Sequence, residues 1–130
     1  MDWQRLCQQL NLGALTDKPM ELTGGLMHTM YKIVTEDGVY AVKCLNPQVM
    51  ARTEAHANFA AAERLENMLE HTDLPILPAL TIGGRKMQEV DGAFFYIFIA
   101  VLVVLCIYCP CFCCRCIIEA IASIVELFAY

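Results

Sequence analysis

The sequence has few charged residues and no cluster of basic ones. Only 18 % of its 130 residues are charged, and 14 acidic side chains outnumber 9 lysines and arginines, which leaves a net charge of −5. A surface that binds nucleic acid needs grouped Lys and Arg side chains to neutralise phosphates, so we expect no nucleic-acid partner. The chain is also 58 % apolar, which excludes a disordered protein.

Charge is missing most completely from the C-terminal part. Residues 93–130 hold 33 apolar side chains in 38 positions, and residues 92–114 carry no charge at all. As a helix, this uncharged stretch is long enough to cross a hydrocarbon core of about 30 Å. The composition therefore predicts an ordinary acidic domain over residues 1–98 and a hydrophobic, helical, cysteine-rich tail over residues 99–130.

The N-terminus lacks the features of a secretory signal. It has no basic segment followed by a continuous apolar run, so we expect a cytoplasmic protein whose thiols are reduced. Six of the eight cysteines crowd into residues 106–116, whereas structural zinc sites usually join two separated cysteine pairs. We therefore predict no metal ligands here. S-acylation beside a membrane is the alternative use of these cysteines.

The first half of the domain predicts a helix and a hairpin. Apolar residues at helical spacing indicate an amphipathic helix over residues 3–10, capped by Asp2 and stopped by Gly13. Residues 30–35 and 39–45 are rich in strand formers and flank Asp37-Gly38, a typical hairpin turn because Gly accepts positive φ. Strand alternation then divides the second of these segments between two faces. One face carries Tyr40, Val42 and Cys44, and the other carries Ala41, Lys43 and Leu45.

The second half predicts the longest helix and further strands. Residues 54–69 contain no Gly or Pro, and Thr53 precedes them as a good N-cap. Their buried stripe is expected to comprise Phe59, Ala62, Leu65 and Leu69. The prolines that follow require an extended chain. Strands are then expected over residues 79–82, 86–90 and 93–98, separated by Gly83-Gly84 and Asp91-Gly92. This order is typical of the α+β class.

One glycine pair and one lysine carry the chemistry. Gly24 and Gly25 lie between two predicted strands, where backbone N–H groups can approach a phosphate. Taken alone, the pair favours a plain turn. Lys43 follows Gly25 by 18 positions, on a strand whose sequence Tyr40-Ala41-Val42-Lys43 is close to the kinase pattern V-A-I-K. A kinase lysine of this kind contacts the α- and β-phosphates, and a glutamate of the next helix holds it. Glu63 is the candidate glutamate, and Glu66 is the alternative.

These segments together resemble the aminoglycoside phosphotransferase and choline-kinase-like family, which are small-molecule kinases with the protein-kinase fold. The resemblance covers residues 21–98 and rests on Leu22-Thr23-Gly24-Gly25-Leu26-Met27-His28, Tyr40-Ala41-Val42-Lys43, Leu45-Asn46-Pro47, Ala62-Glu63-Arg64 and Leu77-Pro78-Ala79-Leu80.

The resemblance implies a kinase-like N-terminal lobe, with a twisted antiparallel sheet and one helix. It also implies ATP as the cofactor and a small hydroxyl compound as the acceptor. Lys43 would bind the ATP phosphates, Glu63 would orient Lys43, and Ala41 would lie beside the adenine. The glycine pair would belong to the phosphate loop.

The catalytic half of such an enzyme is missing. Kinases need a catalytic-loop aspartate as base and further Asp and Asn side chains for Mg²⁺, whereas no histidine here precedes Gly-Asp or Arg-Asp, and no aspartate follows Asp91. We therefore predict no catalytic residue and expect the chain to be inactive alone. It is interpreted as a truncated or frame-shifted phosphotransferase whose residues 99–130 are read out of frame.

Two other functions stay open. The chain could be a single-pass membrane protein that crosses the bilayer within residues 92–114, with a small cytosolic α+β head. The positive flanks on either side of this stretch weakly favour that orientation. However, residues 94–98 cannot be both the last strand of a kinase-like lobe and part of a spanning helix. The third interpretation is a nucleotide-binding pseudoenzyme, which predicts ATP binding that depends on Lys43.

Overall fold

The computed structural model describes residues 1–22, 27–74 and 76–99. These residues belong to two compact units. Those of the first unit lie in Met1–Asn46 and Ala79–Val101, and those of the second lie in Pro47–Pro78. Gly24, Gly25 and nearly all of the predicted tail fall outside the described residues, so the expected helical tail and the domain boundary after residue 98 stay predictions.

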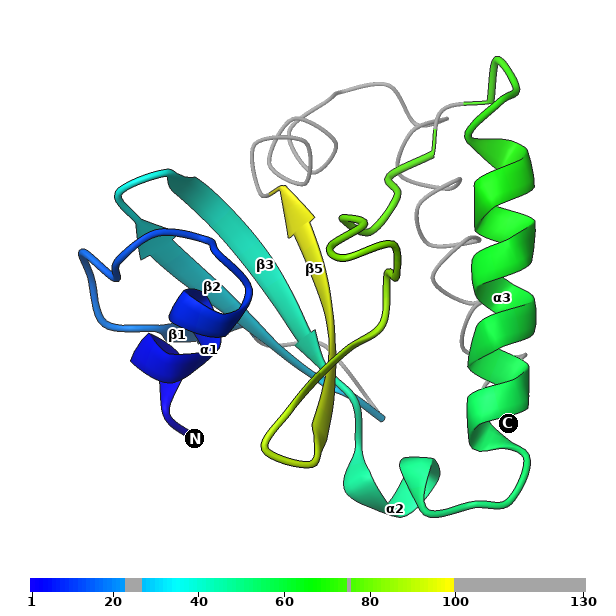
Figure 1. The fold of residues 1–130 in the computed structure, drawn as a ribbon, viewed down its shortest axis with the longest axis horizontal. Helices are drawn as coiled ribbons and strands as arrows, with labels where there is room; N and C mark the ends of the chain where they lie inside the picture. The colour runs from blue at the N-terminus through cyan, green and yellow to red at the C-terminus, as the bar shows by residue number, and fades with distance from the viewer. Residues whose placement is uncertain (23–26, 75, 100–130) are drawn as a thin grey trace. The chain divides into compact units, whose positions relative to one another are not determined.

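The first unit is built on a five-stranded antiparallel sheet, which confirms the α+β class (Figure 1). Its strand order is β1-β2-β3-β5-β4, so β3 and β5 are neighbours although a helical segment and β4 separate them in the sequence. The strands are β1 (Met20–Leu22), β2 (Thr29–Thr35), β3 (Gly38–Cys44), β4 (Gln88–Val90) and β5 (Ala93–Ile99).

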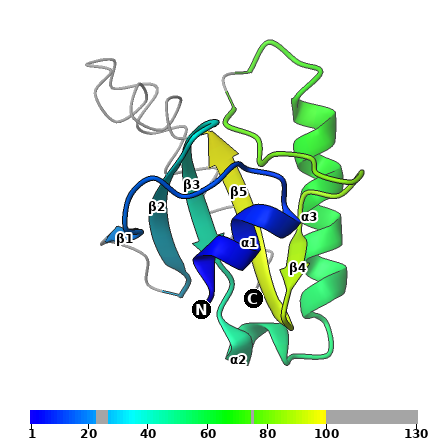
Figure 2. The ribbon, with the colours of Figure 1, turned by 60° about the vertical axis from the view of Figure 1, so that its left-hand side comes forward.

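The core of this unit lies between one face of the sheet and the N-terminal helix α1 (Trp3–Gln9), as Figure 2 shows. Val42 is fully buried there, and Tyr40 and Cys44 pack beside it, so the predicted division of β3 into two faces is confirmed. The other buried members of this cluster are Leu6, Cys7, Leu10, Leu12, Ile33, Val90, Phe95 and Ile97.

Helix α1 begins as predicted and ends earlier. The Asp2 carboxylate accepts a hydrogen bond from the Arg5 N–H at 3.0 Å, which caps the first turn. The predicted stop at Gly13 is wrong, because Asn11 already adopts a positive φ of 54°. The N–H groups of Asn11 and Leu12 then satisfy carbonyls of the last turn. Asparagine adopts the left-handed backbone region more readily than most residues, because its short polar side chain can form local hydrogen bonds.

The two Asp-Gly dipeptides behave differently. Asp91 and Gly92 both have positive φ, 53° and 77°, and join β4 to β5 in the tight turn that the pattern predicts. The β2–β3 hairpin is also confirmed, but Gly38 is the first residue of β3 and has no positive φ. There, the Thr35 hydroxyl accepts from the Asp37 N–H at 3.2 Å and donates to the Leu12 carbonyl, so a side chain stabilises the turn.

The strand predicted over residues 79–82 is wrong. Ile82 forms only an isolated bridge with Arg85 across the Gly83-Gly84 turn, and β4 starts at Gln88 rather than at Lys86. The Gln88 amide Nε2 donates to the carbonyls of Ile82 and Arg85, at 3.1 and 2.6 Å. The N–H groups of Ile82 and Arg85 also donate to these two carbonyls, at 2.8 and 3.2 Å, so the Gln88 side chain adds to backbone hydrogen bonds that already close the turn.

Gly13 packs closely against the β2–β3 turn and supplies a first testable prediction. Its φ is +88°, and a Cβ there would lie 2.8 Å from the Asp37 Oδ2 atom. We expect Gly13→Ala to lower the free energy of unfolding by more than about 1 kcal/mol. Gly84→Ala is the matched control, since Gly84 has a similar φ of +79° but nothing within 4 Å of its added Cβ. Equal losses in urea denaturation would show that the Asp37 contact does not matter.

The second unit contains the short helix α2 (Pro47–Met50) and the long helix α3 (Ala55–Leu69). The sequence did not predict α2, because four residues are too few for a periodic pattern. Helix α3 is confirmed, but its N-cap is Glu54 rather than Thr53, with no side-chain hydrogen bond. The predicted buried stripe is wrong at Leu65, which is 38 % exposed.

Residues 93–99, at the start of the uncharged stretch 92–114, form strand β5. The reading of these residues as the start of a membrane-spanning helix is therefore wrong, because a strand that pairs with β3 and β4 cannot be helical at the same time. Across the described parts of the chain, every helix is too short or too polar to span a bilayer. Residues 100–114 lie outside the described residues.

Candidate functional site

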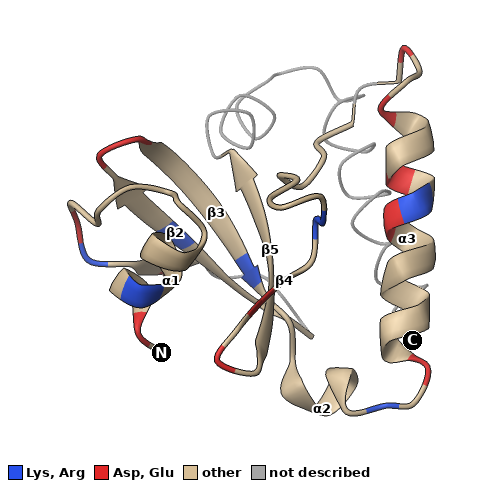
Figure 3. Ribbon diagram, viewed as in Figure 1, with Lys and Arg blue, Asp and Glu red and all other residues tan. Residues whose placement is uncertain are grey.

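Lys43 lies near the end of β3, between β2 and β5, and therefore in the interior of the sheet. Its cross-strand partners are Met30 on β2 and Tyr96 on β5. The side chain is half-buried, whereas Lys32, on the same face of β2, is exposed. Figure 3 shows the two strands each carrying one basic position. The sheet thus surrounds the Lys43 stem with apolar neighbours and holds the residue on a rigid element.

Ala41 lies two positions before Lys43, on the same face of β3. It is 2 % exposed, and its cross-strand partners are Lys32 and Phe98. This is the face opposite to the one that α1 covers. The two predicted cofactor-binding residues of β3 are thus brought together on one face, because strand alternation places positions i and i+2 side by side.

His28 lies just before β2 and was not predicted as a site residue. The imidazole is 5 % exposed, and its Nδ1 atom accepts a hydrogen bond from the Asn46 N–H at 3.0 Å. Burial, together with the positive charge of Lys43, lowers the pKa of His28 to about 4. The ring is therefore neutral at physiological pH, and its electrostatic interaction with Lys43 connects it to the predicted phosphate-binding group.

Cys44 follows Lys43 and faces the core. Burial raises the pKa of its thiol to about 11, so the thiol is protonated at physiological pH and is a poor nucleophile. Cys7, in α1, is buried, and burial raises its pKa as well. These two cysteines, which are free thiols, therefore serve packing rather than covalent chemistry.

The polar residues of α3 are distributed against the expected pattern. Glu63 and Glu66 are both half-buried, while Leu65 and Met68 are 38 % and 68 % exposed. Exposure on this helix therefore does not follow the hydrophobicity of its side chains. Glu63 belongs to the second unit, and its pairing with Lys43 stays a prediction, as does the alternative role of Glu66.

Among the residues that the structure describes, no group of three or more His, Cys, Asp or Glu side chains is arranged to hold a metal ion. What these residues offer is a cation on a rigid sheet, a small residue beside it and a neutral buried imidazole. Such an arrangement can bind and orient an anionic group. Gly24 and Gly25, the predicted phosphate loop, lie outside the described residues.

Sequence reasoning overlooked His28 because its significance depends on Asn46, which is 18 positions away. The only local signal was a histidine three positions after a glycine pair and directly before a strand. Comparison with known proteins adds no assignment: no family model matches this chain, and no curated protein is detectably similar to it.

Proposed function

We propose that this chain carries the ATP-binding lobe of a small-molecule phosphotransferase that resembles the aminoglycoside phosphotransferase and choline-kinase-like family. Lys43 would bind the ATP phosphates, Glu63 would orient Lys43, and Ala41 would lie beside the adenine. Gly24 and Gly25 would belong to the phosphate loop. The acceptor would be a small hydroxyl compound.

The observation that carries this proposal is the position of Lys43. The half-buried Lys43 lies on β3 of an antiparallel sheet, and a glutamate-bearing helix follows that strand in the sequence. Kinases use the same order, a lysine on the third strand and a glutamate on the next helix. The half-buried Glu63 and the buried Ala41 agree with this assignment.

The proposal assigns nucleotide binding to this chain, and catalysis needs groups from elsewhere. Phosphoryl transfer requires a base or water-positioning residue and carboxylates that hold Mg²⁺, and the sequence after Asp91 has no aspartate. We therefore expect ATP binding without turnover from this chain alone. An ATP-binding protein of this kind works in the cytoplasm, where its thiols stay reduced.

A calorimetric titration of the full chain with ATP, with and without Mg²⁺, tests the proposal. Lys43→Met removes the ammonium but keeps an unbranched apolar stem against the sheet. A hydrogen bond that involves a charged group contributes about 1.5–3 kcal/mol, so we expect ATP binding to weaken about 10- to 100-fold.

Lys18→Met is the matched control for this experiment. It removes one positive charge from an exposed position outside the sheet, so it tests whether net charge alone changes ATP affinity. We expect its affinity to stay within about twofold of wild type at physiological salt, because exposed charges are screened. Absence of ATP binding by the wild-type chain would overturn the proposed function, as would an equal loss in both variants.

A further inference from the structure

His28 joins two parts of the chain that the proposed site needs. It lies three positions after Gly25, and Thr29, the next residue, forms the last pair of the β2–β3 ladder with Cys44. The Asn46 N–H then donates to the His28 Nδ1 atom at 3.0 Å. The imidazole therefore connects the start of β2 to the chain that leaves β3, three residues after Lys43.

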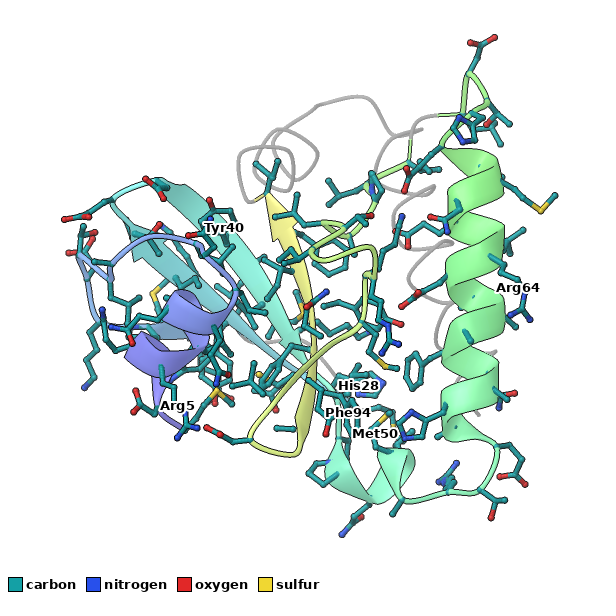
Figure 4. The ribbon with its side chains drawn as sticks, in the orientation of Figure 1. Arg5, His28, Tyr40, Met50, Arg64 and Phe94 are labelled. Atoms are coloured by element: carbon teal, nitrogen blue, oxygen red, sulfur yellow. The ribbon has the colours of Figure 1, made fainter. Side chains whose placement is uncertain are left out.

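The end of β3 is held from two sides. The Leu45 N–H donates to the Phe94 carbonyl on β5 at 2.9 Å, and the next N–H, that of Asn46, donates to His28. Figure 4 labels His28 and Phe94 at this end of the sheet. Two successive backbone amides are thus fixed by different neighbours, and of the two acceptors only the imidazole is a side chain that substitution can remove.

Only the neutral ring can do this. An imidazolium donates from both nitrogen atoms and has no acceptor, so protonation would break the bond to Asn46. It would also place a second positive charge beside Lys43, in a position that is 5 % exposed. Because Nδ1 accepts, the proton of the neutral ring is on Nε2.

We propose that His28 is a positioning residue for nucleotide binding: its neutral imidazole holds the end of β3 and thereby sets the position of the Lys43 ammonium that would bind the phosphates. This inference rests on the proposed function and goes beyond it, since His28 acts through Lys43 and the strand rather than on the nucleotide itself.

Two amide substitutions test the inference. In His28→Asn, the Oδ1 atom occupies the place of Nδ1 and can still accept from the Asn46 N–H; in His28→Gln, the amide lies farther along the side chain, near the place of Nε2. We expect His28→Asn to bind ATP within about threefold of wild type and His28→Gln to bind about tenfold more weakly, as the loss of one buried hydrogen bond implies. Circular dichroism verifies that both variants fold.

A second readout does not use ATP. In nitrogen-15 NMR spectra of the wild-type chain, His28 should be the Nε2–H tautomer, and Lys43→Met should move its titration midpoint upward because a nearby positive charge is gone. The Nδ1–H tautomer, or a midpoint that Lys43→Met leaves unchanged, would overturn the inference.

The two failures are distinguishable. If wild type binds no ATP, the proposed function is wrong and the inference falls with it. If wild type binds ATP and Lys43→Met does not, but His28→Gln binds as wild type does, the inference alone is wrong. If His28→Gln fails to fold, the tautomer and the response to Lys43→Met still decide.

Discussion

Replacing Phe95 by alanine is expected to lower the free energy of unfolding by about 3–5 kcal/mol, the largest loss among the variants considered. Phe95 is 1 % exposed on β5 and belongs to the cluster between the sheet and α1. Truncation removes the transfer free energy of the ring and leaves a cavity, which neighbouring side chains held by the sheet and helix can fill only partly. Urea denaturation followed by circular dichroism measures this loss.

Phe98→Ala is the matched control, because Phe98 is the same residue type on the same strand but points to the opposite face and is only half-buried. We expect a clearly smaller loss. The pair also tests the strand itself: residues three apart share a face in a helix and lie on opposite faces in a strand. Equal losses would contradict the assignment of residues 93–99 to β5.

Acidification is expected to destabilise the wild-type chain between pH 6.5 and pH 4 through His28. The ordinary pKa of histidine in an unfolded chain is about 6.5, whereas burial and Lys43 lower the pKa of His28 in the folded chain to about 4. Within this window the unfolded state binds a proton that the folded state does not, so falling pH favours unfolding. Within this window the free energy of unfolding falls by at most about 1.4 kcal/mol for each pH unit.

The stability that depends on a neutral His28 is fully present above pH 6.5. It is fully lost below pH 4, where the imidazole is protonated in both the folded and the unfolded state. Other groups titrate in the same range, so the measurement is the difference between wild type and His28→Asn, which cannot be protonated at that position. His71→Asn removes an exposed imidazole and controls for the substitution itself. Parallel curves for wild type and His28→Asn would contradict the prediction.

The site around Lys43 could be predicted from the sequence only in part. The V-A-I-K-like strand could be recognised because it is local and continuous, and the structure puts Lys43 and Ala41 on one face as alternation requires. The contribution of His28 could not be predicted in this way. It arises from a hydrogen bond to Asn46 and from the charge of Lys43, neither of which is near His28 in sequence.

Helix α3 also has one feature that the sequence predicts and one that it does not. Its existence and length follow from fifteen residues without Gly or Pro, because helix propensity acts locally. Its buried face does not follow, because Leu65 is exposed while Glu63 and Glu66 are half-buried. Hydrophobicity alone ranks these side chains in the opposite order.

The amino-acid sequence alone determined the local elements of this protein: the capped start of α1, the β2–β3 hairpin, the alternation of β3 and the helix α3. Each depends on residues within a few positions of one another: a capping side chain, residues that favour a turn, the alternation of side chains along a strand, or helix propensity. Only the tertiary structure decided that β3 and β5 are neighbours and that His28 is neutral beside Lys43. These features depend on burial and on partners distant in the chain, since desolvation and charge act through space.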